Sequence, residues 1–504
     1  MKIVYGRDQK IKGSLTGDFD KDYAFLEAVF ERSGDIVKNP FCIVDFCRAA
    51  AIYVDGMTDA DMVEDFVIRP LLKQKWEEKI SGRELLFYIE NHVMETVDWK
   101  EDETFEDILT DILSGNTLLL LEGCKKAIIL STKKYPSRGV GETQQEMVIR
   151  GPKDSFTENM RINTALIRRR IRDPRLKMEH TMTGERSKTD LAIIYMEDLV
   201  RPELLEKIRE KVKNISFDGI FDGGMVEQLL EENAWSPFPQ FQHTERPDKA
   251  ASGLLEGRIV LAVDNSPGVL ILPATYQMFF QAGDDYYTRF EVASFARVLR
   301  FVASLFAIGF PGLYVAIAAF HTEMLPASFL LSVAVARTGI VIPVALEVLL
   351  MEFQFELLKE AGIHLPGQLG GTIGIVGGLI VGQAAVEAGI VSTVVVIVVS
   401  FTAIASFIVP NESFGSVFRL LKFLFIFTAA IWGIYGFLLT FAALLFHLSQ
   451  LESFGVPYML PSVCGENLNY DEKKDDYVRY PFAYMLKRPV FTREGRRIRK
   501  KEGR

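Results

Sequence analysis

The sequence predicts a soluble α/β N-terminal region of two similar subdomains, followed by an all-α membrane domain with several spans. Two blocks of the N-terminal region recur at a constant offset, and charged residues are sparse from Val298 to His447. The stretch Thr372–Val409 is almost wholly apolar. A run of this length is typical of a membrane segment rather than of a helix within a globular core.

The N-terminal region contains an internal repeat. Residues 51–57 align with residues 193–199, and residues 112–130 align with residues 254–272, so both pairs share an offset of 142 residues. Because two separated blocks share one offset, we infer two similar units, at about 21–135 and 160–275, that arose by duplication.

Each unit is expected to be α/β. The first block is a short apolar run, typical of a buried strand, and a charged helix follows it; in the second unit this helix begins at Pro202, with proline and acidic residues in its first turn. The later block consists of two apolar runs separated by a turn, Glu122-Gly123 in one unit and residues 264–268 in the other. This pattern predicts a hairpin.

We therefore divide the chain into six parts. They are an N-terminal segment (1–20), a first soluble subdomain (21–135), a linker (136–160), a second soluble subdomain (161–285), a transmembrane helical domain (286–450) and a basic cytoplasmic tail (451–504).

Composition excludes several classes of function. The 49% hydrophobic and 24% charged content suits a mixture of soluble and membrane parts, and a net charge of -9 does not favour a nucleic-acid partner. No catalytic constellation, metal cluster or cofactor motif is apparent, so we expect no enzyme activity, cofactor or metal. The first residues lack the apolar core of a signal peptide, and the four cysteines lack metal-type spacing and disulfide density. Both features indicate a cytoplasmic, reducing location for the N-terminal half.

A run of three arginines, Arg168 to Arg170, follows the linker. Such a run can bind anionic lipid headgroups or an acidic partner. It is more often a solvated face, and Glu142, Glu146 and Glu158 are available as partners. We prefer this structural alternative.

The membrane half begins with an amphipathic approach, residues 286–300, whose arginines Arg289, Arg297 and Arg300 are expected at the cytoplasmic face. Besides 372–409, spans are expected at about 299–320, 327–350 and 420–448. The basic tail favours a cytoplasmic C-terminal end and hence an even number of crossings. Part of 372–409 is therefore expected to be re-entrant or one long tilted helix, unless a further short span is present.

Two ionisable residues lie within the second expected span, Arg337 and Glu347. Charges at this depth are too costly to face lipid, so Arg337 either pairs within the bundle or lines water. Glu352, Glu356 and Lys359 follow on a helix of interfacial character.

The first half of Thr372–Val409 has two different faces at 100° per residue. Small residues, which permit close helix packing, form one face: Gly374, Gly378, Gly382, Ala385 and Gly389. The opposite face carries Val376, Ile380, Gln383, Glu387 and Val394. A carboxylate within an apolar span is a candidate functional group, although a position near a helix end, reaching the interface, is an open alternative.

Four stretches resemble the A subunit of GerA-type spore germinant receptors. They are residues 141–171 (GETQQEMVIRGPKDSFTENMRINTALIRRRI), 284–301 (DDYYTRFEVASFARVLRF), 342–362 (IPVALEVLLMEFQFELLKEAG) and 373–392 (IGIVGGLIVGQAAVEAGIVS). The resemblance implies a protein of the inner membrane of bacterial endospores, acting with a transporter-like, nutrient-sensing B subunit and a C-subunit lipoprotein. It also implies a homo-oligomer in membrane lipid that forms a nutrient-gated channel for monovalent cations.

In a symmetric oligomer Glu387 becomes an acidic ring, which favours cations, and Val376 or Val394 can close a pore by dewetting. We therefore hypothesise that the face of Val376, Ile380, Gln383, Glu387 and Val394 lines a pore. A tightly packed, non-conducting hairpin is the alternative.

Two other functions compete with the channel. A secondary transporter usually has a paired inverted repeat in its membrane part, whereas the repeat here lies in the soluble half. A non-conducting scaffold that couples a nutrient-sensing partner to other germination proteins would not need Arg337, Gln383 and Glu387 at membrane depth.

Overall fold

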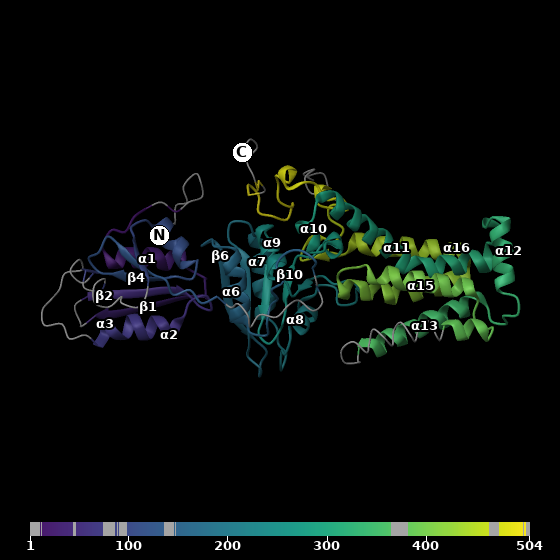
Figure 1. The fold of residues 1–504 in the computed structure, drawn as a ribbon, viewed down its shortest axis with the longest axis horizontal. Coiled ribbons are helices and arrows are strands. Elements are labelled where there is room, and N and C mark those ends of the chain that lie inside the picture. The colour runs from purple at the N-terminus through teal and green to yellow at the C-terminus, as the bar shows by residue number, and fades with distance from the viewer. Residues whose placement is uncertain are drawn as a thin grey trace. The chain divides into compact units, whose positions relative to one another are not determined.

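The computed structural model forms two compact units. It describes residues 11, 13–43, 47–73, 86–87, 89, 98–135, 146, 148–363, 382–462, 473–496 and 498–499. Unit 1 comprises Met1–Glu232, Phe241–Pro273 and Leu486–Arg504, and unit 2 comprises Asn233–Gln240 and Ala274–Met485. Each unit is described by itself (Figure 1).

Unit 1 contains the two predicted α/β subdomains. The first consists of α1 (Phe19–Val29), β1 (Ile36–Ile43), β2 (Cys47–Val54), α2 (Ala60–Val63), the π-helix η1 (Glu64–Ile68), α3 (Arg69–Lys73), β3 (Trp99–Asp102), α5 (Phe105–Ile112), β4 (Thr117–Leu121) and β5 (Ala127–Leu130). The second consists of α6 (Met160–Arg170), β6 (Leu176–Thr183), β7 (Thr189–Met196), α7 (Pro202–Lys213), α8 (Gly223–Leu230), β8 (Gln242–Thr244), α9 (Pro247–Leu255), β9 (Ile259–Val263) and β10 (Val269–Leu272).

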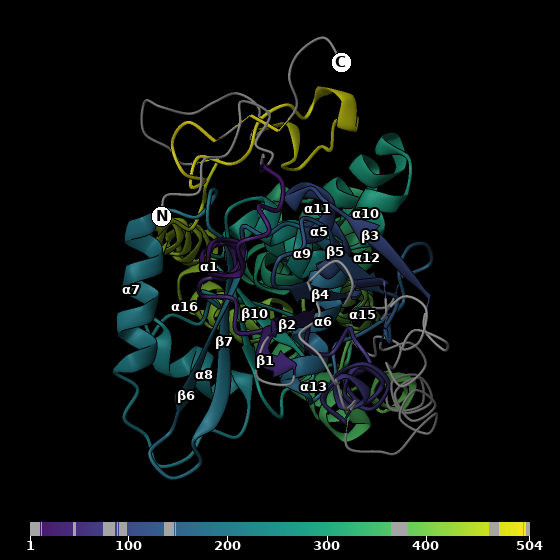
Figure 2. The same cartoon turned by 90° about the vertical axis from the view of Figure 1, so that its left-hand side faces the viewer.

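The two subdomains share one sheet topology, which confirms the predicted pair of similar α/β units. The strand orders are β1-β2-β4-β5-β3 and β6-β7-β9-β10-β8, and every neighbouring pair is antiparallel. Strands β2 and β7, β4 and β9, and β5 and β10 begin at the offset of 142 residues read from the sequence (47 to 189, for example). Figure 2 shows the β6–β7 hairpin in teal at the lower left.

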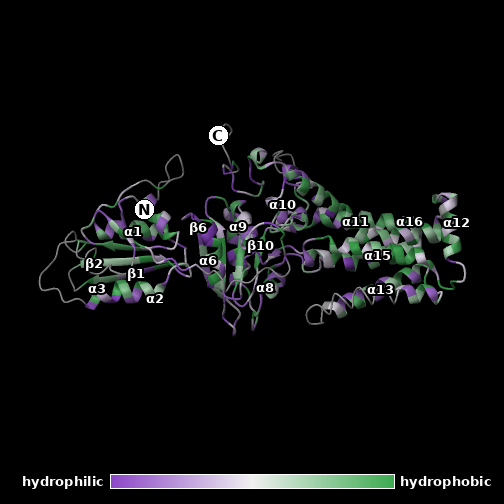
Figure 3. Ribbon diagram, in the orientation of Figure 1, coloured by the Kyte–Doolittle hydropathy of each residue, from purple (hydrophilic) through white to green (hydrophobic). Residues whose placement is uncertain are grey.

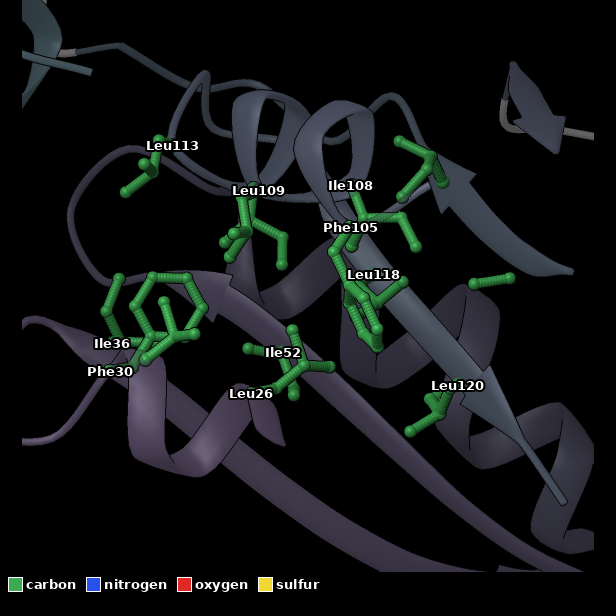
Figure 4. Close-up of a cluster of buried hydrophobic side chains, with 14 of the residues drawn as sticks. Leu26, Phe30, Ile36, Ile52, Phe105, Ile108, Leu109, Leu113, Leu118 and Leu120 are labelled. Carbon is green, nitrogen blue, oxygen red and sulfur yellow. The ribbon is translucent and has the colours of Figure 1, made fainter. Parts of the chain in front are cut away.

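Strands β4 and β5 are buried along their whole length, because both faces of the first sheet are covered. Side chains of α1 and α5 pack on one face with Ile52, Leu118 and Leu120, as Figure 4 shows. Leu119 and Leu121 point to the other face and join a second cluster. A strand buried on both faces has a continuous apolar sequence rather than an alternating one, which is why the runs TLLLL and AIIL are strands.

The first helix of each subdomain begins with the same polar motif. Asp18 caps α1 and Asn159 caps α6, each accepting hydrogen bonds from backbone N–H groups of the first turn. One turn later, Asp22 accepts from the N–H of Thr16 at 3.0 Å and Asn163 from the N–H of Thr157 at 2.7 Å. The acidic stretch near residue 18 is therefore a helix start.

The three arginines at the end of α6 have separate internal partners. Arg168 is 1% exposed and binds Asp35 with two hydrogen bonds of 2.7 and 2.9 Å. Arg170 binds Asp154 at 2.6 Å, and the Arg169 guanidinium lies over the ring of Tyr135. The structural alternative was therefore right, but the expected solvated face and its glutamate partners were wrong. Because Asp35 belongs to the first subdomain, Arg168 joins the two subdomains.

Unit 2 is helical. Its elements are η3 (Tyr276–Phe280), α10 (Asp284–Tyr287), α11 (Phe290–Phe320), η4 (Thr322–Met324), α12 (Ala327–Ala336), α13 (Val344–Ile363), α15 (Thr393–Phe407), α16 (Glu412–Gln450), β11 (Glu452–Ser453), β12 (Val456–Pro457) and η6 (Phe482–Tyr484). Hydrophobic residues dominate α11, α15 and α16 (Figure 3). Among the described residues, α11 and α16 are long and apolar enough to cross a membrane by length and composition, and α15 is a shorter apolar helix.

Helix α16 folds back on itself at Gly433, whose φ of 60° and ψ of -138° are not helical. The hydroxyls of Thr428 and Thr440 are 2.8 Å apart, and the rings of Phe425 and Phe437 lie 5.2 Å apart. Residues twelve apart along a straight helix would be about 18 Å apart. The expected single span at 420–448 was therefore wrong, and the additional pass returns the chain to the end of unit 2 where α16 begins.

The second expected span is also divided. Helix α12 ends at Ala336, and α13 begins at Val344 after an irregular segment that contains Arg337 and Pro343. Proline cannot continue the helical hydrogen-bond ladder and disfavours helix at the residue before it. The continuous helix expected over 327–350 was thus wrong.

The arginines at the start of α11 are used inside the protein. Arg297 is 1% exposed and binds Asp285 at 2.9 Å and Asp475 at 2.7 Å, and Arg300 also binds Asp285 at 2.8 Å. Arg289 is exposed at the helix start. A cytoplasmic-face role expected for all three was wrong for the two buried ones, since their guanidinium groups hold a C-terminal segment.

The stretch expected to be one cytoplasmic tail, residues 451–504, is divided between the units. Its part up to Met485 belongs to unit 2, and the part from Leu486 belongs to unit 1. There Thr492, fully buried, donates a hydrogen bond to the carbonyl of Glu256 at 2.6 Å. The described part of the tail is therefore built into the fold.

Replacing Arg168 with alanine should lower the free energy of unfolding by about 3–5 kcal/mol, because it leaves the Asp35 carboxylate buried without its partner. The matched control is Arg161→Ala: Arg161 pairs with Asp55 at 3.0 Å, but its side chain is 72% exposed. This change should cost less than about 1 kcal/mol. Thermal unfolding of the full chain in detergent measures both, and equal costs would contradict the difference in burial.

Glu227 of α8 supplies a pH-dependent prediction. Burial, together with the nearby Glu231 and Asp222 carboxylates, raises the pKa of Glu227 from 4.5 to about 7. The folded state therefore binds a proton that the unfolded state releases, so stability is lost as pH rises from about 4.5 through 7. At pH 8, Glu227→Gln should be more stable than the wild type by on the order of 2 kcal/mol, with no gain near pH 4. The change Glu210→Gln at an exposed position of α7 is the control, and a gain that does not vary with pH would refute this account.

Candidate functional site: buried charges of the helical unit

The candidate site is built from charged side chains that lie within the apolar helices of unit 2. Arg337, in the segment between α12 and α13, lies 3.1 Å from Glu347 of α13. Glu347 is fully buried, and its second carboxylate oxygen accepts the backbone N–H of Ser392 at 3.0 Å. Ser392 in turn caps the start of α15. Of the two placements expected for Arg337, the structure shows pairing within the bundle.

A second cluster joins α13 to α16. The Lys422 ammonium donates to Glu352 at 2.6 Å and to Glu356 at 2.7 Å, and Arg419 lies 3.6 Å from Glu356. The side chains of Lys422 and Glu352 are 4% and 1% exposed. The interfacial placement expected for Glu352 is therefore wrong.

The position of Lys422 makes this cluster unusual. It lies midway along the first arm of α16, about 15 Å from either end at 1.5 Å per residue. A charge held at this depth is costly in an apolar environment unless it is paired and hydrogen-bonded. Two positive and two negative groups provide that pairing, which ties α13 to the first arm of α16.

The stretch around Glu387 forms a hairpin of two helices. Residues 382–387 are helical, residues 388–392 turn, and α15 follows. Gln383 and Glu387 lie on one exposed face, and the Gln383 amide donates to the Glu387 carboxylate at 3.0 Å. Val394, in the first turn of α15, is half-buried.

The small residues of this stretch have different roles. Gly382 and Ala385 are buried, and a side chain at Gly382 would meet Val396 of α15 at 3.8 Å. Gly389 is exposed in the turn with a φ of +65° and no neighbour within 4 Å of an added Cβ. A positive φ is typical of glycine just beyond a helix end, so the packing role expected for Gly389 was wrong.

Four of the predicted residues, Gly374, Val376, Gly378 and Ile380, lie outside the described residues. Glu387 and the Arg337–Glu347 pair are separate features in the described part of unit 2, and no hydrogen bond printed between described residues joins them.

A hollow of about 720 Å³ opens between α13, residues 382–387 and α15. Its lining is mostly apolar, including Met351, Phe355 and Phe407, and its polar groups include Gln354 and Gln383. Gln383 therefore faces this hollow, and the small residues Gly382 and Ala403 widen it.

The chemistry of the site is electrostatic. Among the described residues, no group of three or more His, Cys, Asp or Glu side chains is placed to hold a metal ion. The Lys422 cluster was not predicted, although one signal was present: Glu352 and Glu356 are four residues apart and lie on one side of a helix. Their partner is 66 residues away in the sequence, so periodicity did not indicate it.

Replacing Lys422 with methionine should destabilise the full chain by about 3–5 kcal/mol, because the Glu352 carboxylate is left buried without its cation. The double change Lys422→Met with Glu352→Met should recover most of this loss. Thermal unfolding in detergent measures both variants. Failure of the double variant to recover would show that packing, rather than charge pairing, dominates here.

Comparison with known proteins gives one consistent family. The model of the family described as Bacillus/Clostridium GerA spore germination protein matches residues 24–491. Spore germination protein A1 of Bacillus subtilis (strain 168) is 38% identical, with 90% of this chain and 91% of that protein covered. Spore germination protein GerLA of Bacillus cereus is 35% identical, covering 88% and 89%. The uncharacterized membrane protein YfkQ of Bacillus subtilis (strain 168) is 37% identical, covering 92% and 89%.

A solved structure also matches the N-terminal half. It is the crystal structure of the N-terminal domain of the A subunit of the Bacillus megaterium spore germinant receptor GerK3. It is 30% identical, covers 53% of this chain and 98% of that chain, and has a TM-score of 0.43. The resemblance found in the sequence is confirmed by the family match and the relatives, and the chain belongs to the GerA family of spore germination proteins, on the A-subunit side.

Proposed function

We propose that this chain is the A subunit of a nutrient germinant receptor in the inner membrane of bacterial endospores, and that it forms a homo-oligomeric, nutrient-gated channel that releases monovalent cations. Family membership supports the germination role. In this proposal a transporter-like B subunit senses the nutrient and a C-subunit lipoprotein completes the receptor. The soluble units and both terminal regions face the spore core, and the chain performs no catalysis.

The pair Gln383–Glu387 carries the channel part of the proposal. Both side chains are exposed, although the helix that bears them packs into the apolar bundle through Gly382 and Ala385. An exposed carboxylate at membrane depth requires water or a polar partner. Placed around the axis of an oligomer, one Glu387 per subunit forms an acidic ring, which attracts cations and repels anions.

The buried clusters support the same function in a different way. Arg337 with Glu347, and Lys422 with Glu352 and Glu356, satisfy their charges within one chain. Their fixed pairs hold α13, α15 and the first arm of α16 together. This leaves Glu387 as a carboxylate whose described hydrogen bond is to a neutral amide, which suits an ion path.

A non-conducting scaffold is the second candidate. The 3.0 Å hydrogen bond between Gln383 and Glu387 favours it, because this bond partly satisfies the carboxylate within its own helix. Such a scaffold would couple a nutrient-sensing partner to other germination proteins without passing ions.

Potassium flux through liposomes that contain the purified full chain, with and without the B subunit, tests the proposal. Glu387→Gln should lower cation flux about tenfold, since the ring no longer raises the local cation concentration. Glu291→Gln, an exposed carboxylate at the start of α11, is the matched control and should leave flux unchanged. Absence of flux with every partner combination would favour the scaffold.

A further inference from the structure

One loop of the chain leaves the second subdomain and is built into the helical unit. Residues 233–240 connect α8 to β8, which both belong to unit 1, but the loop itself belongs to unit 2. Its two ends are held together, because Asn233 donates its N–H to the Gln240 side chain at 3.3 Å and the Gln240 amide donates to the Asn233 carbonyl at 2.9 Å. We call residues 233–240 the closed loop. A loop whose ends meet moves as one compact body.

The centre of the closed loop is Phe238, which is 1% exposed. Its ring lies 6.0 Å from that of Phe414 and 6.0 Å from that of His447. Phe414 lies at the start of the first arm of α16 and His447 near the end of the second. Phe238 therefore contacts both arms of this helical hairpin where they meet at one end of unit 2.

Polar contacts hold the same loop in place. The Ser236 hydroxyl lies 2.9 Å from the His447 ring, the Tyr458 hydroxyl donates to the Pro239 carbonyl at 2.9 Å, and the Ser453 hydroxyl donates to the Gln240 carbonyl at 2.8 Å. Ser453 and Tyr458 lie directly after α16. The closed loop is thus fixed by aromatic packing and by three hydrogen bonds.

The stems of the loop are equally fixed in unit 1. Before it, Lys211 of α7 donates to the Leu230 carbonyl at the end of α8 at 2.7 Å, and Lys207 pairs with Glu232. After it, Phe241 is fully buried and Gln242 pairs with Ile271 in the sheet. Chain between consecutive residues extends by at most about 3.6 Å, so almost no slack separates the two sets of contacts.

We propose that the closed loop is the element through which the second soluble subdomain controls the α16 hairpin. A displacement of α8 or β8 is carried through the short stems to Phe238 and Ser236, and from them to Phe414 and His447. Both arms of the hairpin then move together at their shared end. The physiological effect rests on the proposed function, because it requires that α16 takes part in gating.

The first test measures coupling without reference to germination. Ile271→Ala in β10 loosens the sheet to which β8 is paired, and Ile129→Ala is the equivalent change in β5 of the first subdomain. Hydrogen exchange of the full chain in detergent should increase at residues 414–418 and 447–451 for Ile271→Ala and not for Ile129→Ala. A short Gly/Ser insertion on each side of the loop, after Glu232 and after Gln240, should abolish the increase. If the increase survives the insertions, or never occurs, the proposal is wrong.

The second test uses spores. The double-insertion chain should slow nutrient-triggered potassium release by about tenfold or more, within the usual range of coupling between sites, at wild-type protein level. The same insertion in the exposed β6–β7 turn, after Glu185, is the control and should leave the rate unchanged. A rate within about twofold of the wild type, or release without nutrient, would overturn the role in transmission. If deletion of the whole chain leaves germination unaltered, the proposed function fails instead, and the exchange experiment alone decides the coupling.

Discussion

The helical unit depends on the cost of placing a charge in an apolar environment. Lys422 lies in the middle of an apolar arm, so α13 must bring Glu352 and Glu356 to it. The same constraint brings Glu347 to Arg337 and, through its other oxygen, to the first residue before α15. Three helices are therefore held by pairs that tolerate little displacement, because each partner is destabilised if the other moves away.

The soluble part follows from duplication of one packing solution. Each five-stranded antiparallel sheet places two wholly apolar strands at its centre, and the helix before each sheet begins with the same capping motif. The copies differ where they meet: Arg168 of the second binds Asp35 of the first, and Lys177 donates to the Val29 carbonyl at the end of α1 at 2.8 Å. Buried contacts of this kind make the two subdomains one unit rather than two independent modules.

The two units are linked more than once along the chain. The closed loop leaves unit 1 and returns to it, and the C-terminal segment binds α11 through Asp475 before it enters unit 1 at Leu486. A receptor subunit must convert a change in one part into a change in another. Short, well-packed connections suit this task, since slack would absorb a displacement before it reached the helices.

Much of the fold could be read from the sequence, because the signals for it are local. The offset of 142 residues, the apolar runs of β4, β5, β9 and β10, and the scarcity of charge after Val298 determined two α/β subdomains and a helical membrane part. Only the tertiary structure decided the partners of Arg168 and Lys422, the turn at Gly433 and the place of the loop around Phe238. Helical periodicity reports which face of a helix is apolar, but not which distant residue meets it. One glycine with a positive φ can reverse an apolar helix without altering its composition.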